Sequence, residues 1–436
     1  CLASRCSLPT NNQGPHLKTH ILSTTALSLL RLSRKLWLRV TLFALLAVLA
    51  SAAAILLEDQ IPDGLKARFT PDAVMPILTI LASGMLAVST FSLNVMVTAH
   101  NAAAGQTTPR VHAILLADTT THTVLATFIG AFVYALSAII LFQTGFYPEG
   151  ASVLVLVFTV AVVVLVVVAL LRWIHHLSDL GSMDATLHSI EQAARNSLIR
   201  DRSLPSLGAR RLTDETVLPV EARPLCAPRT GYLQLIDMHA ISEKLGTDQT
   251  RVYLYVRPGA YLVRGQTIGH ATGLSEEERS AICENLTIAA IRSFEQDASY
   301  GLLVLSETAS RALSPGINDP GTAIAVLCRQ EKLLLDWAHA THAEDSPLFP
   351  RLFLPETSRA AMIDTAFASV ARDGAGQIEV ALRLQQVLGR LASAPDSDLA
   401  QAAREMSQHA REYAESALPL ERDKTRLRAA VLSPSP

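Results

Sequence analysis

The chain has 436 residues, half of them hydrophobic, and a formal net charge of −2 at pH 7. Charged residues make up 17%, against about 25% in average soluble domains, and residues 1–176 carry only ten Lys/Arg and six Asp/Glu. This composition excludes a uniformly soluble protein, and neither the net charge nor any basic stripe indicates a nucleic-acid partner. Residues 177–436 carry twenty-seven Lys/Arg and thirty-three Asp/Glu, as expected of a soluble, mildly acidic domain.

Residues 1–30 are rich in Ser, Thr and Asn and show no periodicity. We therefore expect a disordered leader, or a reading frame that has been extended or truncated. A lipid-bearing Cys1 is a further alternative. The five cysteines form no CxxC pair, which favours free thiols in a reducing compartment over a disulfide framework.

Four long apolar stretches, with charge only near their ends, predict membrane-spanning helices at residues 38–57, 74–98, 122–142 and 152–173, inside a transmembrane domain at 31–176. The clearest stretch is Val153 to Leu171, nineteen residues with Thr159 as the only polar side chain. A helix of that length is about 29 Å long, close to the roughly 30 Å of a bilayer core. The lipid bilayer is thus the first predicted partner.

The basic residues near the span ends predict the orientation. Four of them precede the first span, Arg110 lies in the second loop, and Arg172 follows the fourth span. We therefore expect a bacterial inner-membrane protein with both termini in the cytoplasm. A cleaved signal peptide ending near Ala50-Ser51-Ala52 is the alternative for the first span, although signal peptides usually have an apolar core of only about 7–15 residues.

The second half of the chain predicts a soluble α+β domain. Residues 177–228 are expected to form a helical extension and a Pro-rich linker, and 229–272 a small β-rich unit. Residues 273–418 are expected to be helical, including one helix over 275–294 that starts with a capping box at Ser275 and Glu278. Residues 419–436 are expected to be a loose tail.

The second span carries the first candidate site, because polar side chains interrupt it. Ser89, Thr90 and Asn94 need hydrogen-bond partners inside a bilayer. Close helix packing is one interpretation, and a water-lined path formed in an oligomer is the other. At the start of the third span, Asp118 and His122 are i,i+4 neighbours that could pair, carry protons or attract cations, or simply cap the interface.

The second candidate site is the loop Ser314-Pro315-Gly316-Ile317-Asn318-Asp319-Pro320. Asp319 suits the N-cap and Pro320 the first position of a helix, whose free N–H groups attract an anion or a neighbouring carboxylate. Arg311 lies one turn before the loop, within reach to close over it. A structural turn and a ligand-binding or regulatory loop, with Arg311, Ser314, Asn318 and Asp319 as its residues, both stay open.

These residues also carry a family resemblance. The chain resembles bacterial predicted membrane proteins grouped as a domain of unknown function, which have four N-terminal spans and a motif like Arg311–Pro320, Arg-Ala-Leu-Ser-Pro-Gly-Ile-Asn-Asp-Pro. The resemblance covers roughly residues 30–420 and includes Arg257-Pro258-Gly259 and Gln296-Asp297; Gly321 replaces a bulkier residue. It implies a fold and a membrane location, and it supplies no activity.

The sequence thus predicts a four-helix transmembrane bundle followed by a soluble domain with a small β-unit and a helical bundle. No nucleophile–base pair, phosphate loop, metal-ligand set or cofactor motif occurs, so an enzyme is not expected. We expect a homo-oligomeric ion or small-solute pathway regulated by the cytoplasmic domain. The alternative is a non-conducting membrane sensor or scaffold that binds a ligand or partner at the Ser314–Pro320 loop.

Overall fold

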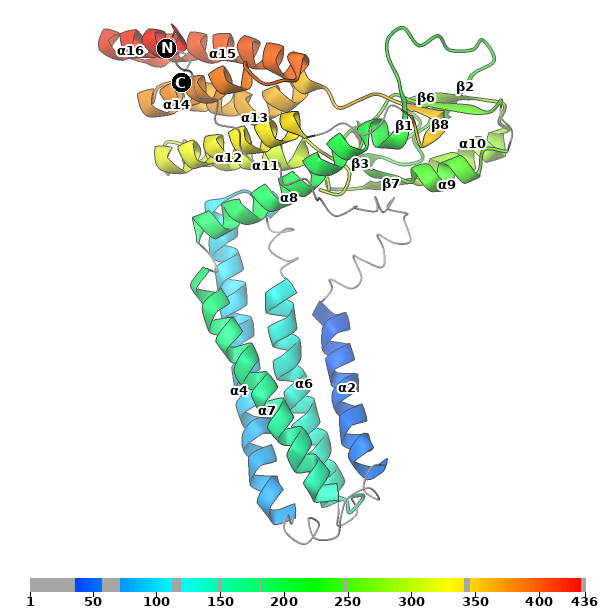
Figure 1. The fold of residues 1–436 in the computed structure, drawn as a ribbon, viewed down its shortest axis with the longest axis vertical. Helices are drawn as coiled ribbons and strands as arrows, with labels where there is room; N and C mark the ends of the chain where they lie inside the picture. Colours follow the sequence, from blue (N-terminus) through cyan, green and yellow to red (C-terminus); the bar gives the residue numbers. More distant parts are fainter. Residues whose placement is uncertain are drawn as a thin grey trace, which may run out of the picture.

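The computed structural model describes residues 36–56, 71–111, 119–147, 151–179, 182–246, 249–340 and 346–432. An N-terminal bundle of apolar helices and a C-terminal domain of helices and sheets lie end to end along the long axis (Figure 1). Within the C-terminal domain, the helices α11–α16 form one side and the strands the other. The predicted leader at 1–30 lies outside the described residues.

Within the described residues, the N-terminal bundle contains the helices α2 (Leu36–Leu56), α4 (Pro71–Gln106), α6 (Thr119–Gln143) and α7 (Ala151–Asp179). Among the described residues, three helices are long and apolar enough to cross a membrane: Asp72–Ala102, Thr120–Gln143 and Ala151–Leu177. They coincide with the predicted spans 74–98, 122–142 and 152–173. The described apolar stretch of α2 is shorter, Trp37–Ala50.

Helix α6 is the centre of the N-terminal bundle. In its most apolar 18-residue stretch 56% is buried, compared with 22% in the corresponding stretches of α4 and α7. Gly130 allows α2 to approach closely, because a Cβ atom at this position would lie 3.1 Å from Phe43 Cβ. On the other side, the Tyr134 hydroxyl donates to the carbonyl of Val155 on α7 at 3.0 Å. Close packing and a satisfied buried hydroxyl hold the bundle together.

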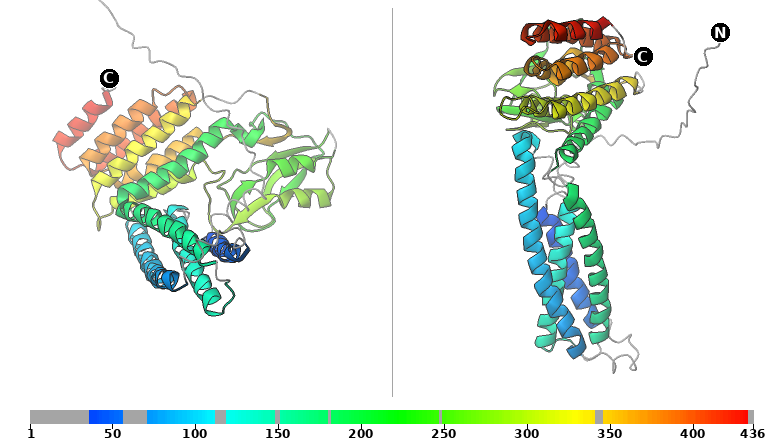
Figure 2. Two further views of the ribbon diagram at one scale, coloured as in Figure 1. Left: turned by 60° about the horizontal axis from the view of Figure 1, so that its bottom comes forward. Right: turned by 90° about the vertical axis from the view of Figure 1, so that its left-hand side faces the viewer.

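Helix α8 (Met183–Ser203) leads from the N-terminal bundle into the C-terminal domain (Figure 2). Ser182 caps its start by accepting a hydrogen bond from the Ala185 N–H at 3.1 Å. Its apolar face, with Leu187, Ile190, Ala194 and Leu198, is buried in the helical core. The predicted helical extension after the fourth span therefore packs as part of the C-terminal domain.

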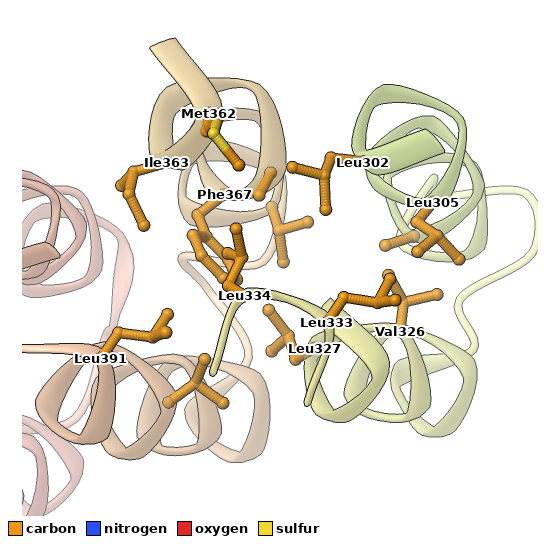
Figure 3. Packing of buried hydrophobic residues seen from close by; sticks show 14 of the residues in the cluster. Leu302, Leu305, Val326, Leu327, Leu333, Leu334, Met362, Ile363, Phe367 and Leu391 are labelled. Carbon is orange, nitrogen blue, oxygen red and sulfur yellow. The ribbon is translucent and has the colours of Figure 1, made fainter. Parts of the chain in front are cut away.

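The helical core joins α8 to α11 (Tyr300–Ala312), α12 (Pro320–His339), α13 (Arg359–Asp373), α14 (Ile378–Leu391) and α15 (Ser397–Ala417). Figure 3 shows Phe367 of α13 beside Leu334 of α12. The predicted tail at 419–436 is wrong over α16 (Glu421–Leu432), whose Leu427 is fully buried against α14 and α15. Most of the other residues of α16 are charged or exposed, so this one buried contact left little signal in the sequence.

Two sheets share the second core of the C-terminal domain. The five-stranded sheet has the order β1 (Ala209–Arg211), β8 (Phe349–Leu354), β4 (Arg251–Leu254), β6 (Thr267–Thr272) and β2 (Arg223–Cys226). The three-stranded sheet has the order β5 (Tyr261–Leu262), β3 (Gly231–Ile236) and β7 (Leu286–Ala289). Strand β8 runs parallel to β1 and β4, whereas the remaining pairs are antiparallel. Short helices α9 (Met238–Glu243) and α10 (Glu276–Cys283) connect these strands.

The β-unit is larger than the predicted 229–272. Strands β1 and β2 lie in the predicted linker, and β8 lies inside the region predicted to be helical. The capping box of Ser275 and Glu278 is confirmed, but the predicted helix 275–294 is wrong beyond Cys283. Residues 286–289 alternate between buried and half-buried positions and pair with β3, because strand pairing outweighs the helical propensity of a short apolar run.

Gly301 provides a test of the packing between α8 and α11. A Cβ atom at this position would lie 2.3 Å from Ala194 Cβ and 2.6 Å from Ala194 Cα. We expect Gly301→Ala to destabilise the protein by about 1–3 kcal/mol, because both helix backbones must move apart. Gly389→Ala in α14 is the matched control, since nothing lies within 4 Å and alanine favours a helix. Thermal unfolding in detergent measures both, and equal melting temperatures would contradict this packing.

Candidate functional site

Helix α4 carries a polar stripe on its outward face. The stripe consists of Thr79, Ser83, Thr90, Asn94 and Thr98, which are all exposed. The predicted pathway residues Thr90 and Asn94 therefore point away from α6 and α7, and Ser89 is half-buried at the edge. The structure places these residues on one helix, on the outward surface of the N-terminal bundle.

The hydroxyl groups of the polar stripe are satisfied within α4 itself. Thr90 Oγ1 donates to the Leu86 carbonyl at 3.0 Å, and Ser89 Oγ donates to the Met85 carbonyl at 2.6 Å. The Asn94 carboxamide differs, because it makes no side-chain hydrogen bond within the described part of the chain. An amide group has two donors and an acceptor that a helix backbone does not satisfy, so Asn94 is the residue with the strongest need for a partner.

Polar groups inside the bundle were missed by the sequence analysis. Ser92 is fully buried and Trp173 is 3% exposed, and neither Ser92 Oγ nor Trp173 Nε1 has a hydrogen-bond partner among the described residues. Ser92 lies one turn from Met96, which shares an apolar cluster with Trp173. The signal was present in the sequence as a serine two positions before Asn94, but its inward direction depends on packing.

The predicted pair at the start of the third span is only partly described. Asp118 lies outside the described residues, and His122 is 7% exposed on the first turn of α6. His122 is thus enclosed by the bundle and does not face open solvent. Arg110 of the preceding loop places Nη1 2.6 Å from both carboxylate oxygens of Glu307 on α11.

The junction between α4 and α11 is the main feature that brings predicted residues together; we call it the α4–α11 clasp. Besides the Arg110–Glu307 ion pair, Arg311 Nη2 donates to the carbonyl of Gly105 in the last turn of α4. Val111 of the short 3-10 helix η2 (Pro109–Val111) is fully buried in the helical core. Two charged contacts and one apolar contact therefore fix the end of α4 to the C-terminal domain. Figures 1 and 2 both show this end of α4 next to the C-terminal domain.

The clasp changes the predicted role of Arg311. This side chain was expected to close over the following loop, but it reaches the other way to α4. The physical reason is that the last four carbonyl groups of a helix have no partner within the helix, so they attract a cation and its N–H donors. Arg311 therefore links the Arg311–Pro320 motif to α4, the helix that carries the polar stripe.

The predicted loop forms a tight connection between α11 and α12. Ser314 Oγ donates to the Arg311 carbonyl at 2.7 Å, and Asn318 adopts φ 50°, a conformation that asparagine tolerates better than most residues. Asp319 caps α12, because Oδ1 accepts from the Thr322 N–H at 3.0 Å and Oδ2 from the Thr322 hydroxyl at 2.6 Å. The predicted N-cap is confirmed. The free N–H groups of this helix start were expected to attract an anion or a neighbouring carboxylate, and Asp319 itself supplies that carboxylate.

The outer part of the loop faces solvent. Pro315, Gly316, Ile317 and Asn318 are exposed, with Ile317 at 47%. One contact supports the loop from outside, in which Gln377 Nε2 donates to Asn318 Oδ1 at 3.0 Å. An exposed apolar side chain on a rigid turn next to the clasp is a surface that a partner or ligand can contact. Among the described residues, no group of three His, Cys, Asp or Glu side chains is arranged to hold a metal ion.

Comparison with known proteins finds a matching family and relatives that cover most of the chain. A family model described as "Predicted membrane protein (DUF2254)" matches residues 33–390. Uncharacterized protein Mb1321c from Mycobacterium bovis and uncharacterized protein Rv1290c from Mycobacterium tuberculosis are each 26% identical over 346 residues. These matches cover 76% of this chain and 66% of each relative, so the chain spans just under two thirds of their length. No solved structure matches.

The Asp319 cap gives a stability prediction with a defined pH dependence. The Thr322 hydroxyl, helped by the Thr322 N–H, lowers the pKa of Asp319 below its usual value. Because the pKa of Asp319 is lower in the folded protein, its ionised carboxylate stabilises the fold at any pH above the unfolded pKa of about 3.9. This stabilisation is lost as the pH falls through the folded pKa of Asp319. We expect Asp319→Ala to cost about 1 kcal/mol at pH 7 and less at pH 3, measured by thermal unfolding. Asp319→Asn, an uncharged cap, should retain most of the stability at pH 7; an equally stable Asp319→Ala would contradict the cap.

The clasp predicts a change in local dynamics. We expect Arg311→Ala to accelerate amide hydrogen exchange of the last turn of α4 by about five- to ten-fold, because a charged hydrogen bond to its carbonyl end is lost. Mass spectrometry of a peptide covering residues 98–106 measures this rate. Arg195→Ala, which removes an exposed arginine paired with Asp336, is the control. Unchanged exchange in the Arg311 variant would show that the bond does not hold α4.

Proposed function

Because the chain belongs to the DUF2254 family of predicted membrane proteins, we propose that copies of it associate in the bilayer and form an ion or small-solute pathway along the polar stripe of α4. The family match and the three long apolar helices support the membrane location. The proposal includes α2 as a fourth span, a bacterial inner membrane, and both termini in the cytoplasm. It includes no catalytic step and no cofactor.

The outward position of Asn94 is the observation that supports the proposal most. In hydrocarbon an amide without a partner costs free energy, and polar side chains in membrane helices therefore face other helices or water. The neighbouring helices α6 and α7 do not offer Asn94 a hydrogen bond in the described residues. A second copy supplies the complementary amide and the row of hydroxyls, and water between the copies supplies the rest.

The α4–α11 clasp supports regulation by the C-terminal domain. The helix that carries the polar stripe is the same helix that Arg110 and Arg311 hold. A ligand or partner that moves the loop after Arg311 therefore moves the end of α4, with no other element in between. This geometry connects the polar residues of α4 with the Ser314–Pro320 loop, the two candidate sites predicted from the sequence.

Asn94→Leu tests the proposed contact between copies. We expect the oligomer to weaken by about three- to twenty-fold, because polar contacts between membrane helices contribute about 0.6–1.7 kcal/mol each. The dissociation constant is measured in lipid or detergent, and ion flux is measured in liposomes with the same variant. Val164→Leu, a conservative change at an exposed position of α7, is the control.

A comparison of the Asn94→Leu variant with the Ser92→Ala variant tests the location of the pathway. Loss of flux in Asn94→Leu with normal flux in Ser92→Ala supports a path between copies. The reverse result places the path inside the bundle beside Trp173 and contradicts the polar stripe. Absence of flux in the wild type under every condition, together with a monomeric protein, contradicts the pathway altogether.

A non-conducting sensor or scaffold is the second candidate function. The exposed side chain of Ile317 on the loop favours it, since about half of this apolar group faces solvent at 47% exposure. A partner protein that binds the wild type and loses affinity for Ile317→Ser, while flux stays absent, supports this candidate. Binding that is unchanged in Ile317→Ser contradicts it.

A further inference from the structure

The joint between the helices and the β-unit contains a strained turn. After α8, the 3-10 turn η3 (Pro205–Gly208) places Ser206 at φ 50°, Leu207 at φ 55° and Gly208 at φ 79°. Left-handed backbone costs a residue other than glycine about 1–2 kcal/mol, so two such residues in a row need support from their surroundings. Ser206 and Leu207 are buried, at 2% and 8% exposure.

Trp337 lies beside this turn between two arginines. The guanidinium carbons of Arg202 and Arg359 lie 4.7 Å and 5.1 Å from the centre of the Trp337 ring. Arg202 donates to the carbonyls of Ala338 and Ala340 at the end of α12 at 3.3 Å and 3.1 Å. The two arginines and the ring thereby join the ends of α8 and α12 to the start of α13.

The segment between β8 and α13 closes the joint. Arg257 donates to the Pro355 carbonyl at 2.6 Å and to Asp201 Oδ1 at 2.9 Å. Arg359 Nη1 donates to Glu356 Oε2 at 2.9 Å. Arg359 Nε lies 3.6 Å from Asp396 Oδ2, too far for a hydrogen bond.

A small cavity, partly open to solvent, lies between these groups. Its volume is about 10 Å³, and it is lined by Asp201, Arg202, Pro205, Ser206, Trp337, Glu356, Thr357 and Arg359. Three of the lining side chains have a buried polar atom with no hydrogen-bond partner in the described residues: Ser206 Oγ, Trp337 Nε1 and Arg359 Nε. Native proteins rarely leave such atoms unpaired, so three around one cavity indicate an occupant.

We propose that this cavity is a binding site for one water molecule that joins the helical part to the β-unit. A cavity of 10–15 Å³ is the space that one water needs, and a phosphate or a larger oxyanion does not fit. The two lone pairs of the water accept from Trp337 Nε1 and Arg359 Nε. Its two hydrogens are donated to Ser206 Oγ and to a carboxylate oxygen of Asp201 or Glu356, so all four hydrogen bonds of the water are used.

The carboxylates decide between water and a halide ion. A halide accepts from N–H groups equally well, but it has no hydrogen to donate to Asp201 or Glu356. The two arginines of the lining already donate to other groups, Arg202 to the Ala338 and Ala340 carbonyls and Arg359 to Glu356. The water therefore supports the strained turn by holding Ser206 in place.

Ser206→Ala tests whether the cavity is occupied, because a wet and a dry cavity predict different changes in the melting temperature. If the water is present, the variant loses a hydrogen bond, and we expect the melting temperature of the full chain in detergent to fall by about 2–4 °C. If the cavity is dry, removing an unpaired hydroxyl raises the melting temperature or leaves it unchanged. Ser293→Ala is the matched control, because Ser293 Oγ is also buried without a partner but does not line this cavity.

A second measurement identifies the occupant independently of this variant. The melting temperature of the wild type is compared in chloride, bromide and gluconate salts at equal ionic strength, with the Ser206→Ala protein alongside. No halide dependence, together with a lower melting temperature of Ser206→Ala than of Ser293→Ala, supports the water. A halide-dependent stabilisation that Ser206→Ala removes overturns the water in favour of an anion, and equal or higher stability of Ser206→Ala overturns an occupied site.

Discussion

The hydrogen bond from Arg311 to the Gly105 carbonyl is the contact on which the functional interpretation depends. It lies where a long apolar helix ends and a polar domain begins, and the Arg110–Glu307 ion pair strengthens it. A helix end attracts such donors because its last carbonyl groups have no partner along the helix. Without this contact, the polar stripe of α4 and the loop after Arg311 are two unrelated features. With it, they belong to one rigid connection between the bilayer and the C-terminal domain of a DUF2254 protein.

The parts of the fold that local chemistry determines were predictable from the sequence. Apolar length was enough for α4, α6 and α7, and cap residues were enough for the starts of α10 and α12. The errors concern strands whose partners lie far away in sequence. Strand β8 pairs with β1 about 140 residues earlier, and β7 was mistaken for the end of a helix because a run of four residues carries too little periodicity. The buried Leu427 of α16 was missed because one contact gives no pattern.

The candidate sites were predictable as residue types, but their directions were not. Ser92 and Asn94 are two positions apart on α4, and one is fully buried whereas the other is exposed. Composition cannot separate them, since the direction follows from where α6 and α7 pack. The same holds for Arg311, whose long side chain reaches either the loop or α4. The groups around Trp337 were beyond sequence reasoning, because five separate segments of the chain contribute to them.

The place of β8 in the five-stranded sheet has a consequence for biosynthesis. Its neighbours β1 and β4 are made more than ninety residues before it, and α11 and α12 are translated in between. Until residue 354 leaves the ribosome, both neighbours have an open edge, and the β-unit is incomplete while the helical hairpin is already available to fold. The two halves of the C-terminal domain are thus interleaved along the chain. The five-stranded sheet is therefore complete only after β8 has been made, and two strand edges stay open to other chains during this interval.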